Sequence, residues 1–276
     1  MRLDEDMRPR RFPVGGWMIV VGIIVLAIGI ISLVAVGGIG HYIKYEDVLV
    51  EEQAENVTKI KIDSASVDIK IVNGGQTDKI TYEGKDVPTD YIGFEIDGST
   101  AKIYKKKKSF SIIGFGSLNM FGKESKITLT VPDKLYDELD MDAGSGTIKL
   151  DGFRVEKADL DCGAGDFSAE NCKFDKLDMD CGAGNIDILD CEIGSLDLDC
   201  GAGNVKFSGK LTEKGKIDCG AGDVDIRIDG SYMDYDVDVD KGIGDVNIEK
   251  GSAQGTGANI PLDIDCGAGD VDVSFK

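Results

Sequence analysis

The sequence has few of the residues on which most active sites depend. Its 276 residues include one tryptophan, Trp17, and one histidine, His41. Basic residues are also scarce, 31 against 51 acidic ones, so the formal net charge is −20. Because a surface of this charge repels phosphate groups, nucleic acid is not expected as a partner, nor is broad adhesion to anionic lipid.

Catalytic and phosphate-binding patterns are missing as well. The glycine-rich stretches read G-x-G, without the third glycine and the following helix pattern of a phosphate-binding loop. Enzymes built on parallel β-helices surround clustered aspartates with long loops, aromatic platforms and basic groups, whereas these repeats carry no long insertions. A polysaccharide-acting β-helix enzyme is therefore only a remote alternative. No catalytic residue, cofactor or cofactor-binding residue is predicted.

A short acidic and glycine-rich stretch, repeated along the chain, dominates what is present. The copies are DMDAGSGTIK (140–149), DLDCGAGDFS (159–168), DMDCGAGNID (178–187), DLDCGAGNVK (197–206), KIDCGAGDVD (216–225), VDVDKGIGDVN (237–247) and DIDCGAGDVD (263–272). The first five follow one another every 19 residues, and the last two have longer spacers. A period near 20 residues is typical of solenoid proteins.

Apolar residues alternate with polar ones inside each copy, as they do in a β-strand. Adding 19 to a position keeps its class, so stacked coils would place equivalent residues in columns about 4.8 Å apart. The predicted inner columns are Met141-Leu160-Met179-Leu198-Ile217, Ile148-Phe167-Ile186-Val205-Val224 and Leu150-Ala169-Ile188-Phe207-Ile226. One coil cannot bury its apolar face alone. The pattern therefore predicts an all-β fold, a β-solenoid (β-helix) of roughly 19-residue rungs over residues 57–276.

Glycines mark the points where the alternation breaks, and they are expected at corners with positive φ. The following position is mostly Asp or Asn, whose side chains bond nearby backbone at turns. The predicted glycine column is Gly146, Gly165, Gly184, Gly203, Gly222, Gly244 and Gly269.

The seven cysteines fall in two inner columns, one with 162, 181, 200, 219 and 266, the other with 172 and 191. Ala143, Phe153 and Lys210 occupy equivalent positions, so cysteine exchanges there with ordinary residues. We expect buried structural thiols, since free cysteine behaves as a small hydrophobe. Stacked disulfides such as Cys172–Cys191 and a metal or redox role are the alternatives, although no C-x-x-C pair occurs.

Aspartates form outward columns on the same strands. Like charges about 4.8 Å apart repel by on the order of 1 kcal/mol per pair in water, so cations are expected to gather there loosely. The weak candidates for this cation binding are Asp159, Asp161, Asp178, Asp180, Asp197 and Asp199. The spacing differs from that of calcium-binding β-rolls, and no specific metal site is predicted.

The N-terminal part of the chain predicts a membrane anchor. Residues 14–40 carry no charge and are long enough for one transmembrane α-helix. Residues 1–13 carry Arg2, Arg8, Arg10 and Arg11, which predicts a cytoplasmic tail and an extracellular repeat domain at the cell membrane. The alternative is a cleaved signal peptide ending at Gly37. Residues 41–56 are expected to be a juxtamembrane linker.

Other segments between the anchor and the regular repeats favour strands. Residues 64–69 are expected to form a degenerate first rung, and 94–108 predict a hairpin that turns at Asp97 and Gly98. The apolar stretch 109–125 follows four lysines, and it is expected either to cover one end of the solenoid or to contact the membrane. The last rung, 263–276, shows no cap, so end-to-end self-association is expected to be possible.

The segment SKITLTVPDKLYDELDMDAGSGTIKL and the D-x-D-x-G-x-G-D/N-[IV] repeats after it resemble the putative-adhesin family of bacterial β-strand-repeat proteins, a domain-of-unknown-function family. The resemblance covers roughly residues 57–276. It implies a β-solenoid on a bacterial envelope and no catalytic residues.

These observations favour a non-enzymatic, membrane-anchored extracytoplasmic scaffold or binding protein of the cell envelope. Seven rungs span only about 30–35 Å, a length that suits an envelope membrane-protein partner near the membrane. The alternative is a surface adhesin or an acidic face that binds wall polymer or cations.

Overall fold

The computed structural model describes residues 45–106, 124–251 and 254–276. This part of the chain is all-β, as predicted, and its one helical turn is a 3-10 turn at Tyr232–Asp234. Within it, no helix has the length and apolarity to cross a membrane. The predicted anchor at 14–40 lies outside the described residues, and so do residues 109–123 of the apolar stretch predicted to cover one end or to contact the membrane.

The strands form two ladders, and most coils contribute one segment to each. The acidic ladder, so called after its outward aspartates, contains in spatial order β5 (Ile92–Asp97), β6 (Thr100–Lys105), β2 (Lys59–Ser66), β8 (Leu135–Ser145), β10 (Arg154–Ala164), β12 (Lys173–Ala183), β13 (Ile186–Cys200), β14 (Val205–Cys219), β18 (Ile260–Ala268) and β16 (Tyr235–Ile243). Only the β5–β6 pair in it is antiparallel.

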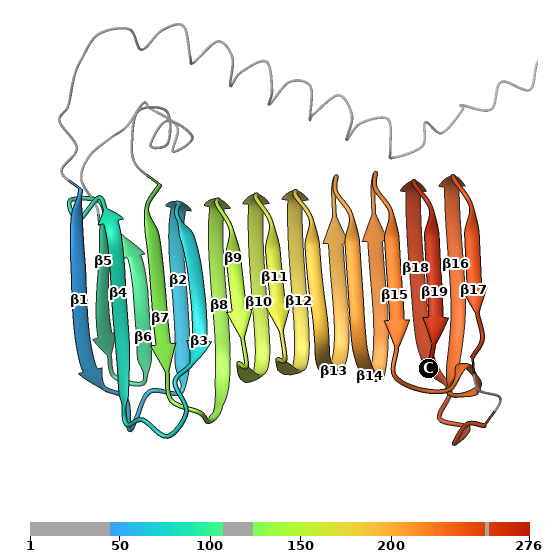
Figure 1. The fold of residues 1–276 in the computed structure, drawn as a ribbon, viewed down its shortest axis with the longest axis horizontal. Coiled ribbons are helices and arrows are strands. Elements are labelled where there is room, and N and C mark those ends of the chain that lie inside the picture. Colours follow the sequence, from blue (N-terminus) through green and yellow to red (C-terminus); the bar gives the residue numbers. More distant parts are fainter. Residues whose placement is uncertain (1–44, 107–123, 252–253) are drawn as a thin grey trace, which may run out of the picture. The chain divides into compact units, whose positions relative to one another are not determined.

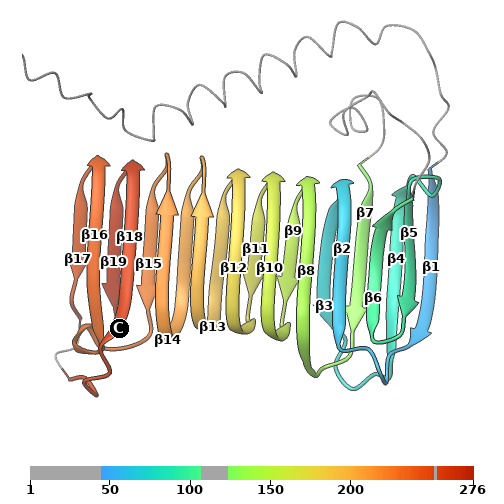
Figure 2. The same ribbon diagram turned by 180° about the vertical axis from the view of Figure 1, so that it is seen from behind.

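The second ladder contains, in spatial order, β1 (Glu46–Gln53), β4 (Lys79–Val87), β7 (Lys126–Val131), β3 (Asp68–Asn73), β9 (Ile148–Asp151), β11 (Phe167–Glu170), the first parts of β13 and β14, β15 (Val224–Ile228), β19 (Val271–Phe275) and β17 (Val246–Glu249). The β1–β4 and β4–β7 pairs are antiparallel. Figure 1 and Figure 2 show the two ladders from opposite sides.

The parallel pairs follow the register that the 19-residue repeat predicts. Leu160 pairs with Met141 on one side and Met179 on the other, and Phe167 pairs with Ile148 and Ile186. All the inner columns named above are buried, and Leu160, Ile186 and Ile188 are fully enclosed. The predicted columns are thus confirmed, and they form one continuous core between the two ladders.

The predicted corner glycines are confirmed as well. Their φ angles lie between +120° and +147°, a region that other residues avoid. Close packing adds a second reason, because a Cβ on Gly203 would lie 1.9 Å from the carbonyl oxygen of Gly184 in the preceding coil.

The residue after each glycine bonds to the next coil rather than to its own turn. The Asn185 N–H donates to Asp166 Oδ1 at 2.9 Å, and the Asp223 N–H donates to Asn204 Oδ1, also at 2.9 Å. The same bond continues from Asp245 N–H to Asp270 Oδ1 at 2.8 Å. These side chains therefore tie each corner to its neighbour.

The spatial order of the coils departs from the chain order at two places. The β2–β3 coil, predicted as a first rung, does pair with β8 and β9, but β6 and β7 lie on its other side. The β18–β19 coil lies between β14–β15 and β16–β17 (Figure 1). The expectation that 263–276 forms the open end is therefore wrong, because β16 and β17 cover that coil.

Two expectations for the first part of the chain have different outcomes. The hairpin at Asp97 and Gly98 is confirmed by the antiparallel β5–β6 pair. The segment 41–56, expected to be a linker, instead contains β1, which pairs with β4. Its Val48 and Val50 alternate with polar residues and pack against the core, a pattern that the many glutamates around them obscure.

Candidate binding surface on the acidic ladder

The outward side chains of the acidic ladder form three parallel columns. The outer column is Lys59, Glu138, Lys157, Lys176, Ser195 and Lys214. The middle column is Lys61, Asp140, Asp159, Asp178, Asp197, Lys216, Asp263 and Asp238, and the inner column is Asp63, Asp142, Asp161, Asp180, Asp199, Asp218, Asp265 and Asp240. The six candidate aspartates thus lie together in two adjacent columns, three in each.

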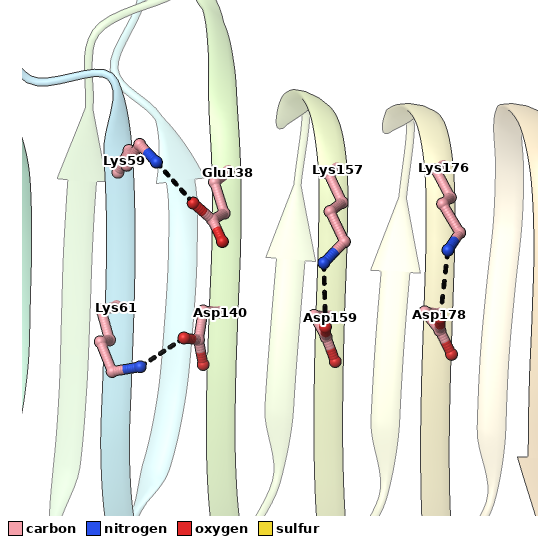
Figure 3. Close-up of polar contacts among 8 residues, drawn as sticks. All are labelled: Lys59, Lys61, Glu138, Asp140, Lys157, Asp159, Lys176 and Asp178. Carbon is pink, nitrogen blue, oxygen red and sulfur yellow. Dashed lines mark hydrogen bonds and ion pairs between the residues drawn. The ribbon is translucent and has the colours of Figure 1, made fainter.

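Lysines neutralise much of the middle column. Lys157 Nζ lies 3.1 Å from Asp159 Oδ2, and Lys176 Nζ lies 3.3 Å from Asp178 Oδ2, each pair within one strand (Figure 3). Alternate residues of a strand point to the same side, which explains the K-x-D spacing. These pairs are exposed and contribute little stability, typically about 0–1 kcal/mol each. The middle column is therefore a mixed-charge surface along most of its length.

At two places a lysine on one strand forms an ion pair with an acidic residue on the neighbouring strand. Lys61 pairs with Asp140 and Lys59 Nζ lies 2.7 Å from Glu138 Oε2, so β2 supplies two positive charges at one side of the regular coils (Figure 3). Further along, Lys216 Nζ lies 2.6 Å from Asp218 Oδ2 and 3.8 Å from Asp197 Oδ1. The charge pattern is therefore built across strands as well as along them.

The inner column consists of aspartates alone, and their carboxylates repel one another. Partial burial raises the pKa of Asp161, and the charge of Asp180 adds to the rise. Partial burial, together with the hydrogen bond and charge of Asp218, raises the pKa of Asp199 to about 6. Although burial acts in the opposite direction, hydrogen bonds with Lys216 and Asp199 lower the pKa of Asp218. Asp199 is therefore protonated more readily than an ordinary aspartate as the pH falls.

A specific metal site does not emerge from these columns. In the described part of the chain, no three or more His, Cys, Asp or Glu side chains converge as metal ligands would. Carboxylates in a straight column face solvent side by side, whereas a hard cation such as calcium needs six to eight oxygens around it. Loose cation binding at the six aspartates stays a prediction.

The lysines are the residues that the repeat pattern alone did not identify. Attention to the aspartate columns leaves out Lys157, Lys176 and Lys216, although each stands two residues before an aspartate. That K-x-D spacing was the available signal. The cross-strand pairs of Lys59 and Lys61 required knowledge that β2 lies beside β8.

All seven cysteines are free and buried. Burial, followed by the neighbouring Cys181, raises the pKa of the Cys162 thiol to about 12. In the second column, the Cys172 N–H donates to Cys191 Sγ at 3.4 Å. The thiols are therefore part of the core, and Cys172 and Cys191 do not form a disulfide in this structure.

The prediction that Lys210 belongs to the column of Cys172 and Cys191 is wrong. Cys191 pairs with Gly209 rather than Lys210, because the register shifts by one residue after Ile188. A side chain would not fit there, since a Cβ on Gly209 would lie 2.0 Å from the Cys191 carbonyl oxygen. A second irregularity after Ile193 restores the period, so Lys214 pairs with Ser195.

Comparison with known proteins identifies a family and solved structures of similar fold. A family model described as Toastrack DUF4097 matches residues 57–276. A crystal structure of a putative adhesin from Bacteroides fragilis has a TM-score of 0.55 at 15% identity, covering 85% of this chain and 100% of that one.

Two further solved structures come from Parabacteroides distasonis. A putative adhesin has a TM-score of 0.43 at 13% identity, covering 84% of this chain and 98% of that one. A putative lipid binding protein has a TM-score of 0.36 at 18% identity, covering 83% and 94%. The search of curated proteins finds no match. At these identities, the Bacteroides structure supports the fold alone.

Proposed function

Since the chain belongs to the Toastrack DUF4097 family, whose model matches residues 57–276, we propose that it is a non-enzymatic binding or scaffold protein of a bacterial cell envelope. The observation that carries the proposal is the acidic ladder, where outward charges repeat coil by coil over a rigid core. Such a regular surface suits an extended contact with another macromolecule better than the enclosure of a small substrate.

The proposal includes a β-solenoid held outside the cell by a single anchor at 14–40, with residues 1–13 in the cytoplasm. The uncharged run of this segment and the arginines before it support that orientation. The mass of the mature protein from membranes tests the anchor. A protein that retains residues 1–40 supports it, whereas a protein cleaved after Gly37 would show that these residues are a signal peptide.

We propose an envelope membrane protein as the partner. The test is crosslinking in cells followed by affinity purification from membranes, for the native chain and for a variant carrying Asp159→Asn, Asp178→Asn and Asp197→Asn. Recovery of the same membrane protein from both samples supports the scaffold function. These substitutions remove three exposed charges, so they are expected to leave the fold intact.

The second candidate function is a surface adhesin or wall-polymer-binding protein that uses the acidic face directly. The two aspartate columns favour it, because a basic or cation-bridged polymer would bind along them. Recovery of wall polymer alone from the native chain, and its loss from the triple asparagine variant, would select this function over the first.

A carbohydrate depolymerisation assay on the purified chain tests the remote enzymatic alternative, and we expect no product.

A further inference from the structure

The stack of coils is open at the β16–β17 coil. In the part of the chain that the structure describes, β16 pairs only with β18, and β17 pairs only with β19. Their inward residues Val239 and Val246 are only partly buried, whereas Ile264 and Val271, which pair with them in the covered coil, are almost fully enclosed. Backbone groups on this free side are therefore available to another strand.

The open end is also the most uniformly acidic part of the acidic ladder. Asp236, Asp238 and Asp240 point outward from β16, and Asp263 and Asp265 follow on β18; we call these five residues the acidic end. Among the described residues, none of the five forms an ion pair with a lysine or arginine. The nearby Lys241 donates instead to the Gly244 carbonyl.

The chain itself shows what binds beside such a strand. On the other side of the regular coils, β8 presents Glu138-Leu139-Asp140-Met141, and β2 pairs with it in parallel through Lys59-Ile60-Lys61-Ile62. The two lysines form ion pairs with Glu138 and Asp140 (Figure 3). The two isoleucines are buried. Alternating basic and aliphatic residues thus satisfy both the outward charges and the inward core.

The β16 strand repeats the features of β8 at the open end. Asp238 and Val239 occupy the same columns as Asp140 and Met141, by way of the intervening strands. Asp236-Val237-Asp238-Val239 therefore presents the same alternation of acidic and aliphatic residues as Glu138-Leu139-Asp140-Met141. The lysine-bearing strand that accompanies β8 has no counterpart here among the described residues.

A second copy of this chain is a poor occupant of the open end. The strands at the opposite end of the stack are β1, with the sequence EDVLVEEQ, and β5, with the sequence IGFEID. Both strands contain acidic residues and no basic ones. The outward positions of β16 also lack basic residues. Like charges placed opposite each other across a strand pair are destabilising. Charge complementarity therefore favours a basic partner.

We propose that the β16–β17 edge binds an extended segment of a partner protein in which Lys or Arg alternates with aliphatic residues, and that this segment adds to β16 as the next strand. Strand addition supplies affinity through main-chain hydrogen bonds, and alternate side chains supply specificity. The proposal rests on the proposed binding function and assigns that function to one end of the acidic ladder.

A synthetic peptide tests the site directly. The full-length chain in detergent is titrated into the fluorescein-labelled peptide TKIKIKS, which repeats the alternation of β2, and binding is followed by anisotropy. We expect saturable binding that weakens at high salt, since exposed charges are screened. The charge-reversed peptide TEIEIES and the non-alternating peptide TKKKIIS are expected not to bind measurably.

Matched variants locate the contact. The combination Asp236→Asn, Asp238→Asn and Asp240→Asn should weaken TKIKIKS binding about tenfold, from the loss of three exposed ion pairs. The combination Asp159→Asn, Asp178→Asn and Asp197→Asn removes the same number of charges from covered strands and should leave the affinity unchanged. A photoreactive peptide should crosslink within 235–249. An unchanged melting temperature for both variants excludes unfolding as the cause.

Several results would overturn the inference. They are equal weakening in both triple variants, crosslinks confined to β1 or β5, equally tight binding of TKKKIIS, or a concentration-dependent dimer that the β16 variant abolishes. Recovery of the membrane partner in cells by the native and the β16-variant chains alike would also overturn it while leaving the proposed scaffold function intact. Failure of partner recovery with intact peptide binding would instead count against the scaffold function.

Discussion

At the scale of single residues, neighbouring coils adjust to one another inside a column. Ala169 lies between Leu150 and Ile188 in one inner column, and Phe207 follows Ile188. All four are buried to 2% exposure or less, so a small side chain in one coil is compensated by larger ones nearby. The column requires apolar volume rather than a particular residue. For this reason an alternating pattern with a fixed period was sufficient to predict the core.

Replacing an inward residue by a charge should unfold the domain. Ile186→Asp places a carboxylate between Phe167 and Val205, where no basic partner lies. The expected loss is several kcal/mol, because the charge is buried without compensation. Thermal unfolding followed by circular dichroism measures it, with the outward neighbour substitution Asp187→Asn as control. An Ile186→Asp variant that melts with the native chain would be incompatible with the core described above.

Removing a charge from the inner column should stabilise the folded domain. Because the folded-state pKa of Asp199 is raised to about 6, its ionisation opposes folding, and stability should fall as pH rises from about 4 to about 6. Asp199→Asn should therefore raise the melting temperature at pH 7 by about 1–3 °C, with no gain near pH 4. Asp197→Asn is the control, since Asp197 pairs with Lys216. A gain that persists at pH 4 would contradict the electrostatic explanation.

The cysteines should react only after unfolding. Each of the seven is 6% exposed or less, and the raised pKa of Cys162 further disfavours its reactive thiolate. A bulky maleimide should label the native chain slowly and the denatured chain completely, as mass spectrometry would show. Cys181→Ala should cost on the order of 1 kcal/mol, as for a small cavity. Rapid labelling of the native chain would place these thiols outside the core.

At the scale of the coil, corners and strands impose different demands. Strand residues are interchangeable within a class, whereas each corner glycine must both take a positive φ and approach the preceding coil closely. The asparagines and aspartates after the glycines add a hydrogen bond to the next coil. The sequence predicted where the corners lie. The bonding across coils was not predicted, because a single repeat contains no information about its neighbour's backbone.

Gly203→Ala should be far more damaging than a substitution at an ordinary turn. The added Cβ would lie 1.9 Å from Gly184 O, at a φ of +140°. The expected cost is on the order of 3 kcal/mol or more, since backbone must move in two coils. Gly98→Asn is the control, because Gly98 has a φ of +61°, with no atom within 4 Å of an added Cβ, and asparagine tolerates that conformation. Chemical denaturation compares the two, and similar midpoints would contradict this explanation of the corner.

At the scale of the described domain, the order of the coils is the feature that the sequence did not predict. The β16–β17 and β18–β19 coils have the same columns, so both chain order and exchanged order preserve the register. In the observed order the Tyr235 hydroxyl donates to Leu211 O at 2.7 Å. Tyr232 and Tyr235 also pack against Phe275. Periodicity identifies columns but not which coil comes next, and the acidic end could not be located without that order.

Deleting residues 260–276 should therefore affect more than the deleted coil. Because β18 and β19 carry the β16–β17 coil, their removal should expose 235–249 to hydrogen exchange and lower the melting temperature by several degrees. Hydrogen exchange read by mass spectrometry measures the first effect and thermal unfolding followed by circular dichroism measures the second, with Lys276→Ala in the full chain as control. If 235–249 stays protected in the shortened chain, the coil has moved onto β14 and β15, and the exchanged order is not obligatory.

The exchanged order has a consequence for biosynthesis. A ribosome releases β16 and β17 before β18 and β19, so at that moment the growing stack ends at β14 and β15 and the newly made coil has not met its eventual support. It must either wait or dock temporarily in the position that belongs to β18 and β19. If it waits, the acidic and aliphatic strand β16 is exposed on both sides, and if it docks, one side stays exposed. The cell therefore has to complete this end of the molecule against the direction of synthesis, by inserting the later segment behind the earlier one.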